Sequence, residues 1–457
     1  MKHFFDPTII REYDIRGIYN STLSEEDAVR FGHVFALTLK KNKIVNVACD
    51  GRHSSIPLKK SLIHGLVEGG ANVRDIGLGP TPMLYFSCFE NDCEAGIMIT
   101  GSHNPPTHNG FKIVKDKVSF FGENLKKLSI LAEDYELKKK GKLLKNFDIS
   151  KIYLQNLVSR LNQKKELNIA WDAGNGSAGA VMEKLSKFVK GKNILLYSEI
   201  NGDFPNHHPD PSDHSTLQDL INNVKEKKLD FGIAFDGDGD RIGVVDDKGS
   251  IIPGDLLLLL FAQEIIEKND KACIIGDVKC SQVLFDQVNR LGGRAVMSKT
   301  GHSLVKNTMK KESADLAGEM SGHIFFSDKY YGFDDALYAA VRLINLMSST
   351  DKKLSEVVSK FPKLFNTPEI RIDCDDREKF ELIEKIIKNQ KGKKFSSIDG
   401  IRVSLKDGWW LLRASNTQAA IVLRCEANTE HGLKTMIDTV KYELSLINSK
   451  LAEQIIT

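Results

Sequence analysis

An acidic run, Asp236-Gly-Asp-Gly-Asp-Arg241, has the spacing of a cation site. In an extended segment positions i, i+2 and i+4 face one side, so Asp236, Asp238 and Asp240 converge. Three like charges need a cation between them, and hard oxygen ligands suit Mg²⁺ or Ca²⁺. An EF-hand loop is excluded, because its sixth position would be Arg241 instead of glycine and its twelfth position is not glutamate. The run therefore predicts a divalent-metal site.

A second polar loop, Thr100-Gly-Ser-His-Asn-Pro105, follows an apolar run that is typical of a strand. An ordinary serine needs help to act as a nucleophile, and His103 cannot easily reach back to the hydroxyl of its neighbour Ser102. No GxSxG elbow is present. A phosphorylated Ser102 fits better, because its group carries about −1.5 to −2 charges and its oxygens would complete a Mg²⁺ site with the three aspartates. From this loop alone, a turn without chemistry stays open.

Two further loops carry polar groups that suit a sugar phosphate. In Gly318-Glu-Met-Ser-Gly-His323, Glu319 and Ser321 stand two positions apart and can both face vicinal hydroxyls. In Arg413-Ala-Ser-Asn-Thr-Gln418, an arginine fork precedes small hydroxyl and amide side chains, which together make a phosphate cradle. Polar turns without a ligand remain the alternative for both loops.

Two other patterns suggest different chemistry. Gly174-Asn-Gly-Ser-Ala-Gly179 matches the GxGxxG dinucleotide fingerprint, but the preceding strand already ends in Asp172 and no hydride-acceptor site accompanies it. We therefore expect these glycines to close a tight strand-to-helix turn. Asn206-His-His-Pro-Asp-Pro211 resembles a metal motif, yet its adjacent histidines lie in a proline-rich loop, which favours a structural or interdomain role.

The elements that must position these loops alternate between short apolar strands and longer amphipathic helices. Ile44–Cys49 is a predicted strand and Pro57–Gly69 a predicted helix with leucines on one face. A weak repeat relates Val45–Asp50, Leu167–Asp172 and Cys273–Asp277, each an apolar strand that ends in aspartate. The repeat predicts three related α/β domains with mixed sheets, each offering a loop at the C-terminal end of its strands.

The tail after Pro368 changes character, because predicted strands in a meander are flanked by two predicted helices. This pattern predicts a fourth, α+β domain. The predicted domains are 1–148 with the serine loop, 149–252 with the metal loop, 253–366 with the sugar loop, and 367–457 with the phosphate loop.

Composition bounds the possible functions of the 457 residues. The formal net charge of +3 argues against a protein that coats nucleic acid. The longest apolar block, Leu256–Ala262, is far below the ~20 residues that a membrane span needs. Seven cysteines without CxxC spacing favour a reducing compartment. We expect a cytoplasmic monomer with no nucleic-acid or membrane partner.

In combination, the loops resemble the α-D-phosphohexomutase superfamily, most closely its bacterial phosphomannomutase/phosphoglucomutase members. The resemblance covers essentially the whole chain, and its motifs occur in the family's order. They are Tyr13–Gly17, Thr100–Pro105, Asn109–Lys112, Asp236–Arg241, Gly276–Lys279, Lys299–His302, Gly318–His323 and Arg413–Thr417.

The resemblance implies four domains around one central cleft, the fourth with a TATA-box-binding-protein-like fold that has no DNA role. It implies a phosphoserine at Ser102 and Mg²⁺ held by Asp236, Asp238, Asp240 and a phosphoserine oxygen. Arg16, His103, Lys112 and Arg241 would surround the transferring phosphoryl group, with His323 as a candidate for proton transfer. The residues that would hold the sugar are Tyr13, Lys279, His302, Glu319 and Ser321, and those that would hold the other phosphate are Arg413, Ser415, Asn416 and Thr417.

The implied activity is the interconversion of hexose 1-phosphates and 6-phosphates, with mannose or glucose as the sugar, through a hexose 1,6-bisphosphate. The alternatives are a phosphoglucosamine mutase, a Mg²⁺-dependent sugar phosphatase, and a sugar-phosphate-binding protein without catalysis. The glucosamine enzymes usually carry another residue at the position of Met320. The resemblance therefore favours glucose and mannose as substrates. We also expect domain four to move on a hinge near Asn366–Pro368.

Overall fold

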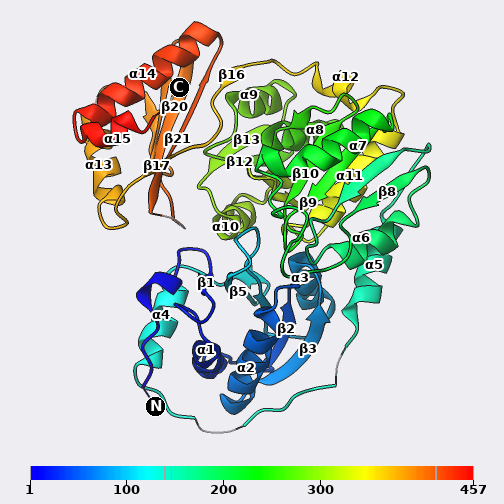
Figure 1. Ribbon diagram of the computed structural model, residues 1–457, viewed down its shortest axis with the longest axis vertical. Coiled ribbons are helices and arrows are strands. Elements are labelled where there is room, and N and C mark those ends of the chain that lie inside the picture. Colours follow the sequence, from blue (N-terminus) through cyan, green and yellow to red (C-terminus); the bar gives the residue numbers. More distant parts are fainter. Residues whose placement is uncertain are drawn as a thin grey trace.

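The fold comes from a computed structural model that describes residues 2–137, 140–145, 147–390, 392, 394–416 and 419–455. The chain forms four domains: three α/β domains with mixed sheets and a C-terminal domain with an antiparallel sheet. Figure 1 shows the first domain in blue to cyan at the bottom, the C-terminal domain in orange to red at the upper left, and the second and third domains in green to yellow at the right. Within the described residues, no helix has both the length and the apolar character that a membrane crossing requires.

The first domain has a sheet in the order β1-β5-β4-β2-β3, with β6 paired to β5. Its central strands β2, β3 and β4 are parallel, whereas β5 and β1 are antiparallel to their neighbours. The strands are β1 (Ile15–Ile18), β2 (Ile44–Cys49), β3 (Asn72–Leu78), β4 (Ala95–Ile99), β5 (His108–Lys115) and β6 (Val118–Ser119). The helices are η1 (Pro7–Ile9), α1 (Glu25–Leu37), α2 (Ser55–Glu68), α3 (Thr81–Glu90) and α4 (Glu123–Ala132).

Alternation along β2 explains how this sheet is covered on both faces. Val45, Val47 and Cys49 belong to the core with α1, α2 and α4, while Ala48 belongs to the core with α3 and the next domains. Helix α1 begins where the Ser24 side chain accepts from the Asp27 backbone and Asp27 accepts in return, a complete capping box.

The second and third domains repeat the same strand pattern. The second has the order β11-β10-β9-β7-β8 and the third β13-β12-β14-β15, and in each the central strands are parallel and the next is antiparallel. The second domain contains α5 (Ile149–Ser159), β7 (Ile169–Asp172), α6 (Gly179–Ser186), β8 (Asn193–Leu196), η2 (His214–Leu217), α7 (Gln218–Glu226), β9 (Phe231–Phe235), β10 (Ile242–Asp246) and β11 (Ile251–Ile252). The third contains α8 (Gly254–Ile266), β12 (Cys273–Asp277), α9 (Gln282–Arg290), β13 (Arg294–Ser298), α10 (His302–Glu312), β14 (Leu316–Gly318), β15 (Ile324–Phe326), α11 (Ala336–Ser348) and α12 (Leu354–Val358).

This repeat gives the three polar loops equivalent places. The Ser102 loop joins β4 to β5, the Asp236–Asp240 loop joins β9 to β10, and the Glu319 loop joins β14 to β15. Each loop leaves the C-terminal end of a strand that runs parallel to its other neighbour and returns in an antiparallel strand. Ligand sites of open α/β sheets lie at this end.

The C-terminal domain is an antiparallel sheet in the order β16-β21-β20-β19-β18, with β17 also paired to β21. Its apolar core lies between the sheet and its helices. The elements are β16 (Phe365–Asn366), β17 (Ile370–Asp373), α13 (Lys379–Asn389), β18 (Phe395–Ser396), β19 (Ile401–Leu405), β20 (Gly408–Ala414), β21 (Ala420–Ala427), α14 (Glu430–Ser445) and α15 (Ser449–Glu453).

Candidate active site

The loop between β9 and β10 brings three carboxylates together. Asp236, Asp238 and Asp240 are fully buried, and one ligand atom from each lies within 4.8 Å of the others. Gly239, with φ of +73°, lets the chain turn there, and Asp236 Oδ1 accepts from the backbone N–H of Asp240 and Arg241 at 3.1 Å. Asp238 Oδ1 is buried without a hydrogen-bond partner among the described residues. These buried oxygens fit a hard divalent cation.

Lys112 of β5 inserts its ammonium group into this cluster. Its Nζ donates to Asp238 Oδ2 at 2.7 Å and to Asp240 Oδ2. Burial lowers the pKa of Lys112, but the aspartates outweigh burial and the net shift is upward. Burial also raises the pKa of Asp236 well above its usual value, while Lys112 and His323 overcome burial and hold that of Asp240 well below. A positive charge is therefore already stabilised where a metal would bind.

Ser102 lies directly beside the carboxylates although it comes from another domain. Its Oγ donates to Asp236 Oδ2 at 3.0 Å, and its φ of +50° turns the side chain out of the strand direction. Its backbone N–H donates to Thr100 Oγ1 at 2.8 Å. His103 Nδ1 lies 3.3 Å from the Ser102 Oγ. The structure thus brings the predicted serine and the predicted metal loop together.

Cations lie near His103, the neighbour of this serine. Burial and then the charges of Arg241, Arg16 and Lys112 push the pKa of His103 well below its usual value, so its imidazole is neutral. Arg16 in β1 donates to Asp14 Oδ2 at 2.6 Å, while its buried Nε has no hydrogen-bond partner among the described residues. An anionic group on Ser102 would have these cations as partners, in competition with the carboxylates that they now contact.

Arg52 is a residue that the sequence reasoning missed. Its guanidinium is fully buried and donates to the carbonyl oxygens of Ser102, Asn104 and Pro105 at 2.6–2.7 Å. It also donates to Asp50 Oδ2 at 3.2 Å, and the same oxygen accepts from the Gly101 backbone N–H at 3.2 Å. Arg52 therefore fixes the backbone of the serine loop through these three carbonyl oxygens. An arginine two residues after a strand that ends in aspartate was the available sequence signal.

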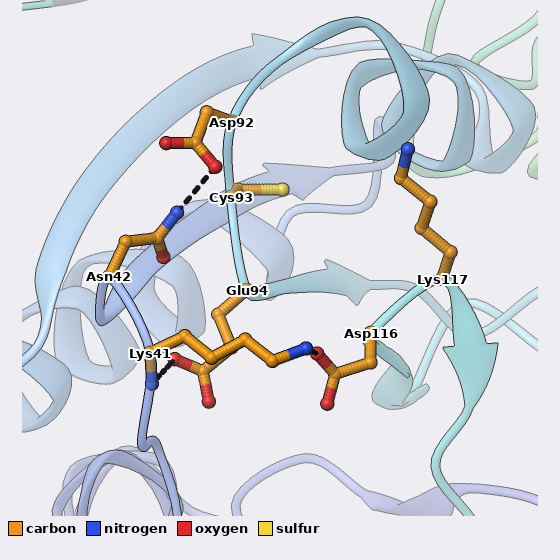
Figure 2. A pocket seen from close by; sticks show the side chains of 7 residues that line it. All are labelled: Lys41, Asn42, Asp92, Cys93, Glu94, Asp116 and Lys117. Carbon is orange, nitrogen blue, oxygen red and sulfur yellow. Dashed lines mark hydrogen bonds and ion pairs between the residues drawn. The ribbon is translucent and has the colours of Figure 1, made fainter.

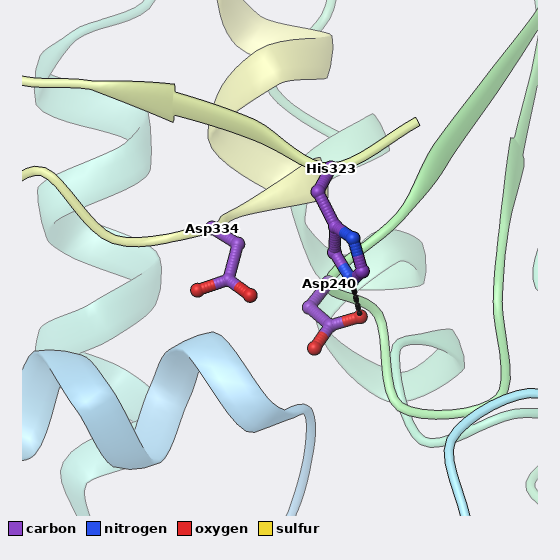
Figure 3. A group of neighbouring side chains, drawn as sticks. All are labelled: Asp240, His323 and Asp334. Carbon is purple, nitrogen blue, oxygen red and sulfur yellow. Dashed lines mark hydrogen bonds and ion pairs between the residues drawn. The ribbon is translucent and has the colours of Figure 1, made fainter. Parts of the chain in front are cut away.

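The sugar loop of the third domain meets the metal loop through His323. Its Nδ1 lies 2.8 Å from Glu319 Oε2, and its Nε2 lies 3.1 Å from Asp240 Oδ1 and 3.4 Å from Arg241 Nε. Figure 3 shows the His323 imidazole above Asp240, with Asp334 to the left of both residues. Burial lowers the pKa of His323, but Asp240 and Glu319 outweigh burial and raise it to about 9. The partner Glu319 has a pKa lowered to about 2 despite its burial, because His323 binds it.

The other predicted sugar-site residues lie around this centre. The Gly301 N–H donates to Glu319 Oε1 at 2.6 Å and leads into α10, which begins at His302. Ser321 Oγ lies 3.4 Å from His323 Nδ1, and Lys279 Nζ donates to Glu369 Oε2 at 2.9 Å.

Tyr13 joins three domains at one hydroxyl. It donates to the Thr300 carbonyl oxygen of the third domain at 2.7 Å and accepts from Asn416 Nδ2 of the C-terminal domain. In the same loop Arg413 Nε donates to Asp399 Oδ2 at 2.9 Å, and Ser415 is buried. Thr417, the remaining predicted phosphate contact, lies outside the described residues. The structure brings the other predicted loops of all four domains to one region.

A separate cavity of about 370 Å³ lies at the opposite end of the first domain's sheet. It is lined at the start of β2 and β4 and the end of β5, and Figure 2 shows Lys41 paired with Asp116 and Asn42 with Asp92. Lys41 binds Asp116, and the Glu94 carboxylate accepts from the Lys40 and Lys41 backbone N–H groups at 2.7 Å. None of the predicted site residues lines this cavity.

Comparison with known proteins agrees with the geometry. Models of the phosphoglucomutase/phosphomannomutase family match all four parts: α/β/α domain I at residues 7–135, domain II at 151–249, domain III at 253–365, and the C-terminal domain at 369–441. A phosphomannomutase/phosphoglucomutase of Pseudomonas putida is 42% identical over 97% of each chain. A phosphoglucomutase of Neisseria gonorrhoeae is 40% identical over 95% of this chain and 96% of its own.

A solved structure extends the likeness to three dimensions. The phosphoglucomutase/phosphomannomutase family protein of Burkholderia thailandensis superposes with a TM-score of 0.91 at 36% identity, covering 99% of both chains. The chain therefore belongs to the α-D-phosphohexomutase superfamily, close to its bacterial phosphomannomutase/phosphoglucomutase members, and by homology over nearly its full length it is an isomerase with phosphomannomutase/phosphoglucomutase activity.

Proposed function

We propose that this isomerase works through a phosphorylated Ser102 and a hexose 1,6-bisphosphate intermediate. The observation that carries the proposal is the position of the Ser102 Oγ, 3.0 Å from Asp236 Oδ2 and beside His103, on which the charges of Arg241, Arg16 and Lys112 act. Arginine and lysine side chains bind a neutral hydroxyl only weakly, whereas they bind the oxygens of a phosphate strongly.

We propose that Asp236, Asp238 and Asp240 hold Mg²⁺ together with an oxygen of the phosphoserine. The support is their shared burial and the unpartnered Asp238 Oδ1. A bound Mg²⁺ would supply electrostatic stabilisation for the charge that spreads over the transferring phosphoryl group. Lys112, which now occupies the carboxylates, would then be free to turn its ammonium towards that phosphoryl group.

The proposed reaction has two phosphoryl transfers. In the first, the bond between phosphorus and the Ser102 Oγ breaks and a bond to the free hydroxyl of a hexose monophosphate forms, while that hydroxyl loses its proton. The bisphosphate then turns end for end, and its other phosphate returns to Ser102. Arg16, Lys112, Arg241 and His103 would surround the transferring group, because positioning and charge stabilisation dominate such a reaction.

His323 is the group that we propose for proton transfer. Its Nδ1 is engaged by Glu319 at 2.8 Å, which leaves Nε2 as the atom that faces the metal loop. Nε2 would take or return the proton of the sugar hydroxyl as the phosphoryl group moves.

We propose that the sugar and the idle phosphate are held by different domains. Glu319 and Ser321 would bind vicinal hydroxyls, with Lys279, His302 and Tyr13 beside them. The C-terminal loop would bind the idle phosphate through Arg413, Ser415, Asn416 and Thr417. One fixed cradle serves both halves of the reaction, because either phosphate of the bisphosphate can occupy it.

We further propose that the partners are small sugar phosphates and that the protein acts as a cytoplasmic monomer. Seven free cysteines, five of them buried, suit a reducing compartment.

The test is a mutase assay on mannose 1-phosphate, glucose 1-phosphate and glucosamine 1-phosphate, with trace bisphosphate as activator. We expect isomerisation of the first two sugars, loss of activity in Ser102→Ala, and a higher Mg²⁺ requirement in Asp238→Asn. Ser129→Ala, which changes an exposed hydroxyl on α4, is the matched control. Steady release of inorganic phosphate without isomers would indicate a phosphatase, and preference for glucosamine 1-phosphate would indicate a phosphoglucosamine mutase.

A further inference from the structure

A second cluster of potential metal ligands lies beside the aspartate loop. Asp240, His323 and Asp334 are buried, and one ligand atom from each lies within 4.8 Å of the others. They come from three segments: the loop after β9, the residue before β15, and the segment between β15 and α11. In Figure 3 the Asp334 carboxylate and the His323 ring both point towards Asp240.

The orientation of His323 suits a metal ligand. Glu319 Oε2 lies 2.8 Å from Nδ1, so the other ring nitrogen, Nε2, faces Asp240 Oδ1 at 3.1 Å. A carboxylate behind a histidine fixes the ring and increases the basicity of the nitrogen that binds metal. Asp240 Oδ1 is also distinct from Asp240 Oδ2, which Lys112 contacts.

An independent observation comes from Asp334. Its Oδ1 accepts from Lys306 Nζ at 2.8 Å, but its Oδ2, in a residue with no exposed surface, has no hydrogen-bond partner among the described residues. His302 Nδ1 lies 3.5 Å from that oxygen, and neither nitrogen of this buried ring has a hydrogen-bond partner there. The two groups attract each other across this distance, but the contact is long for a hydrogen bond, so Asp334 Oδ2 stays available to a ligand.

We propose that Asp240, His323 and Asp334 form a second divalent-cation site that takes a borderline-soft ion such as Zn²⁺, and that its occupation inhibits the enzyme. The binding stands on the side chains alone. The inhibition rests on the proposed function, because the ion would occupy the His323 Nε2 that is assigned to proton transfer.

The donor set favours Zn²⁺ over Mg²⁺. Mg²⁺ prefers six oxygen ligands, whereas Zn²⁺ binds imidazole nitrogen and carboxylate oxygen together in a tetrahedron. Ligands in such a tetrahedron lie roughly 3.3 Å apart, as bond lengths of about 2.0–2.2 Å require. The pair formed by Asp240 and His323 is already at 3.1 Å, and the Asp334 ligand atom lies within 4.8 Å of both, so small side-chain movements complete three corners of the tetrahedron. The ammonium groups of Lys112 and Lys306 nearby limit the affinity, which suits a reversible inhibitor.

Binding is tested without reference to catalysis. Zn²⁺ is titrated calorimetrically into the full chain after chelator treatment, in saturating Mg²⁺ so that the aspartate loop is occupied. We expect one Zn²⁺ per chain, and an affinity that falls at least about tenfold in Asp334→Asn. His207→Gln is the matched control, because His207 forms a similar pair with Asp172 at 3.0 Å elsewhere and should leave Zn²⁺ binding unchanged.

Two further measurements keep the test decisive. If Asp334→Asn does not fold, His323→Gln gives the same comparison. Co²⁺ in place of Zn²⁺ reports the ligand type, and we expect no thiolate-to-metal charge-transfer absorption. Zn²⁺ affinity that is equal in the parent and these variants overturns the site. So does thiolate absorption, which would place the ion on the cysteines, or loss of binding in Asp236→Asn alone, which would place it in the aspartate loop.

The activity arm separates the two proposals. Zn²⁺ at its binding concentration should inhibit parent isomerisation at saturating Mg²⁺, and higher Mg²⁺ should not relieve the inhibition. Zn²⁺ binding by a protein without mutase activity would support the second cation site and contradict the proposed function. Mutase activity that is insensitive to bound Zn²⁺ would overturn the inhibitory role.

Discussion

Buried charges at the candidate site hold one another in place. Lys112 contacts Asp238 and Asp240, and His323 bridges Asp240 to Glu319. Each charge would be costly to bury alone, and removing one partner strands the other. The cluster therefore favours a cooperative site in which a metal and a phosphate can replace the internal ion pairs.

At this scale Arg52 gives the first prediction. Arg52→Lys should reduce kcat/KM by about 100-fold, because an ammonium group cannot span the three carbonyl oxygens that fix the serine loop, and misplaced reacting groups lose rate on this order. Steady-state kinetics measure the change. Arg74→Lys, at an arginine that contacts Asn46 in the same domain, should stay close to the parent. Equal losses in the two variants would contradict this role of Arg52.

Sequence could predict the residues whose chemistry is local. The spacing of Asp236, Asp238 and Asp240 alone indicates a converging carboxylate set, and the structure brings these residues together. Arg52 has only its place two residues after Asp50 as a local signal, and Asp334 has none. Their partners, Ser102 and Asp240, are distant in the chain, so only the fold reveals the contact.

At the scale of elements, two of the strand-terminal aspartates, those of the first and third domains, anchor polar loops of the candidate site. Asp50 Oδ2 accepts from the Gly101 N–H of the serine loop at 3.2 Å. Asp277 Oδ1 accepts from the Met320 N–H of the sugar loop at 3.3 Å. The repeated strand ending in aspartate thus has a physical purpose, because it ties each central strand to a neighbouring loop.

The glycine-rich turn after β7 supports the metal loop, which agrees with a structural role for its GxGxxG pattern. Ser177 N–H donates to the Gly237 carbonyl oxygen at 2.9 Å, and a Cβ on Gly176 would lie only 2.9 Å from that oxygen. Gly176→Ala should cost about 1–3 kcal/mol of stability and weaken Mg²⁺ activation, because the metal loop must shift. Thermal unfolding and Mg²⁺ titration measure both effects.

Its control is Gly432→Ala in α14, where the nearest atom to an added Cβ is a side-chain oxygen at 3.1 Å. This change should leave the Mg²⁺ requirement unaltered, since α14 belongs to the C-terminal domain. Unchanged Mg²⁺ activation in Gly176→Ala would mean that the turn does not position the metal loop.

The neighbouring histidine loop predicts a pH effect on stability. His207 Nε2 lies 3.0 Å from Asp172 Oδ2, and although burial lowers the pKa of His207, the Asp172 contact outweighs it and the net shift is upward. The charged pair therefore stabilises the fold fully below pH 6.5, and its contribution is lost as pH rises through the raised pKa. The melting-temperature deficit of His207→Gln should be largest in acid and shrink at alkaline pH. A deficit that grows with pH would refute the pairing.

Most strands could be predicted from the sequence, because their apolar runs are bounded by polar turns. Ile44–Cys49 and Cys273–Asp277 coincide with their predictions. Helix α2 begins at Ser55, two residues before the predicted Pro57, because proline is tolerated inside the first turn, where backbone N–H groups lack helical partners. Helix α3 gives no amphipathic signal, since it is buried nearly all round between the first domain and the next.

At the scale of the whole molecule, the C-terminal domain is fastened to the third domain. Arg402 donates to the Val278 and Cys280 carbonyl oxygens at 2.8 and 2.9 Å and stacks 3.6 Å from the Trp409 ring centroid. The expected hinge residue Asn366 lies in β16, which is hydrogen-bonded to β21. We therefore propose that movement of this domain is absorbed just before β16, at residues 361–364, outside the helices and strands.

Tyr13 gives the prediction at this scale, because its hydroxyl closes the site across three domains. Tyr13→Phe should loosen the closure and admit water, which raises the ratio of inorganic phosphate release to isomerisation several-fold. Coupled assays of both products measure the ratio. Tyr19→Phe, at a tyrosine whose hydroxyl donates to Glu25 at 2.8 Å within the first domain, is the control. An unchanged ratio in Tyr13→Phe would show that closure does not depend on this contact.

The central claim is that Ser102 carries the phosphoryl group, and peptide mass analysis tests it most directly. The intact protein is incubated with a hexose 1,6-bisphosphate, and a portion then receives excess hexose monophosphate. We predict one phosphate on Ser102, which leaves on addition of the monophosphate as bisphosphate appears without inorganic phosphate. Isomerisation that proceeds while Ser102 stays unphosphorylated, or with the phosphate on another residue, would contradict the account.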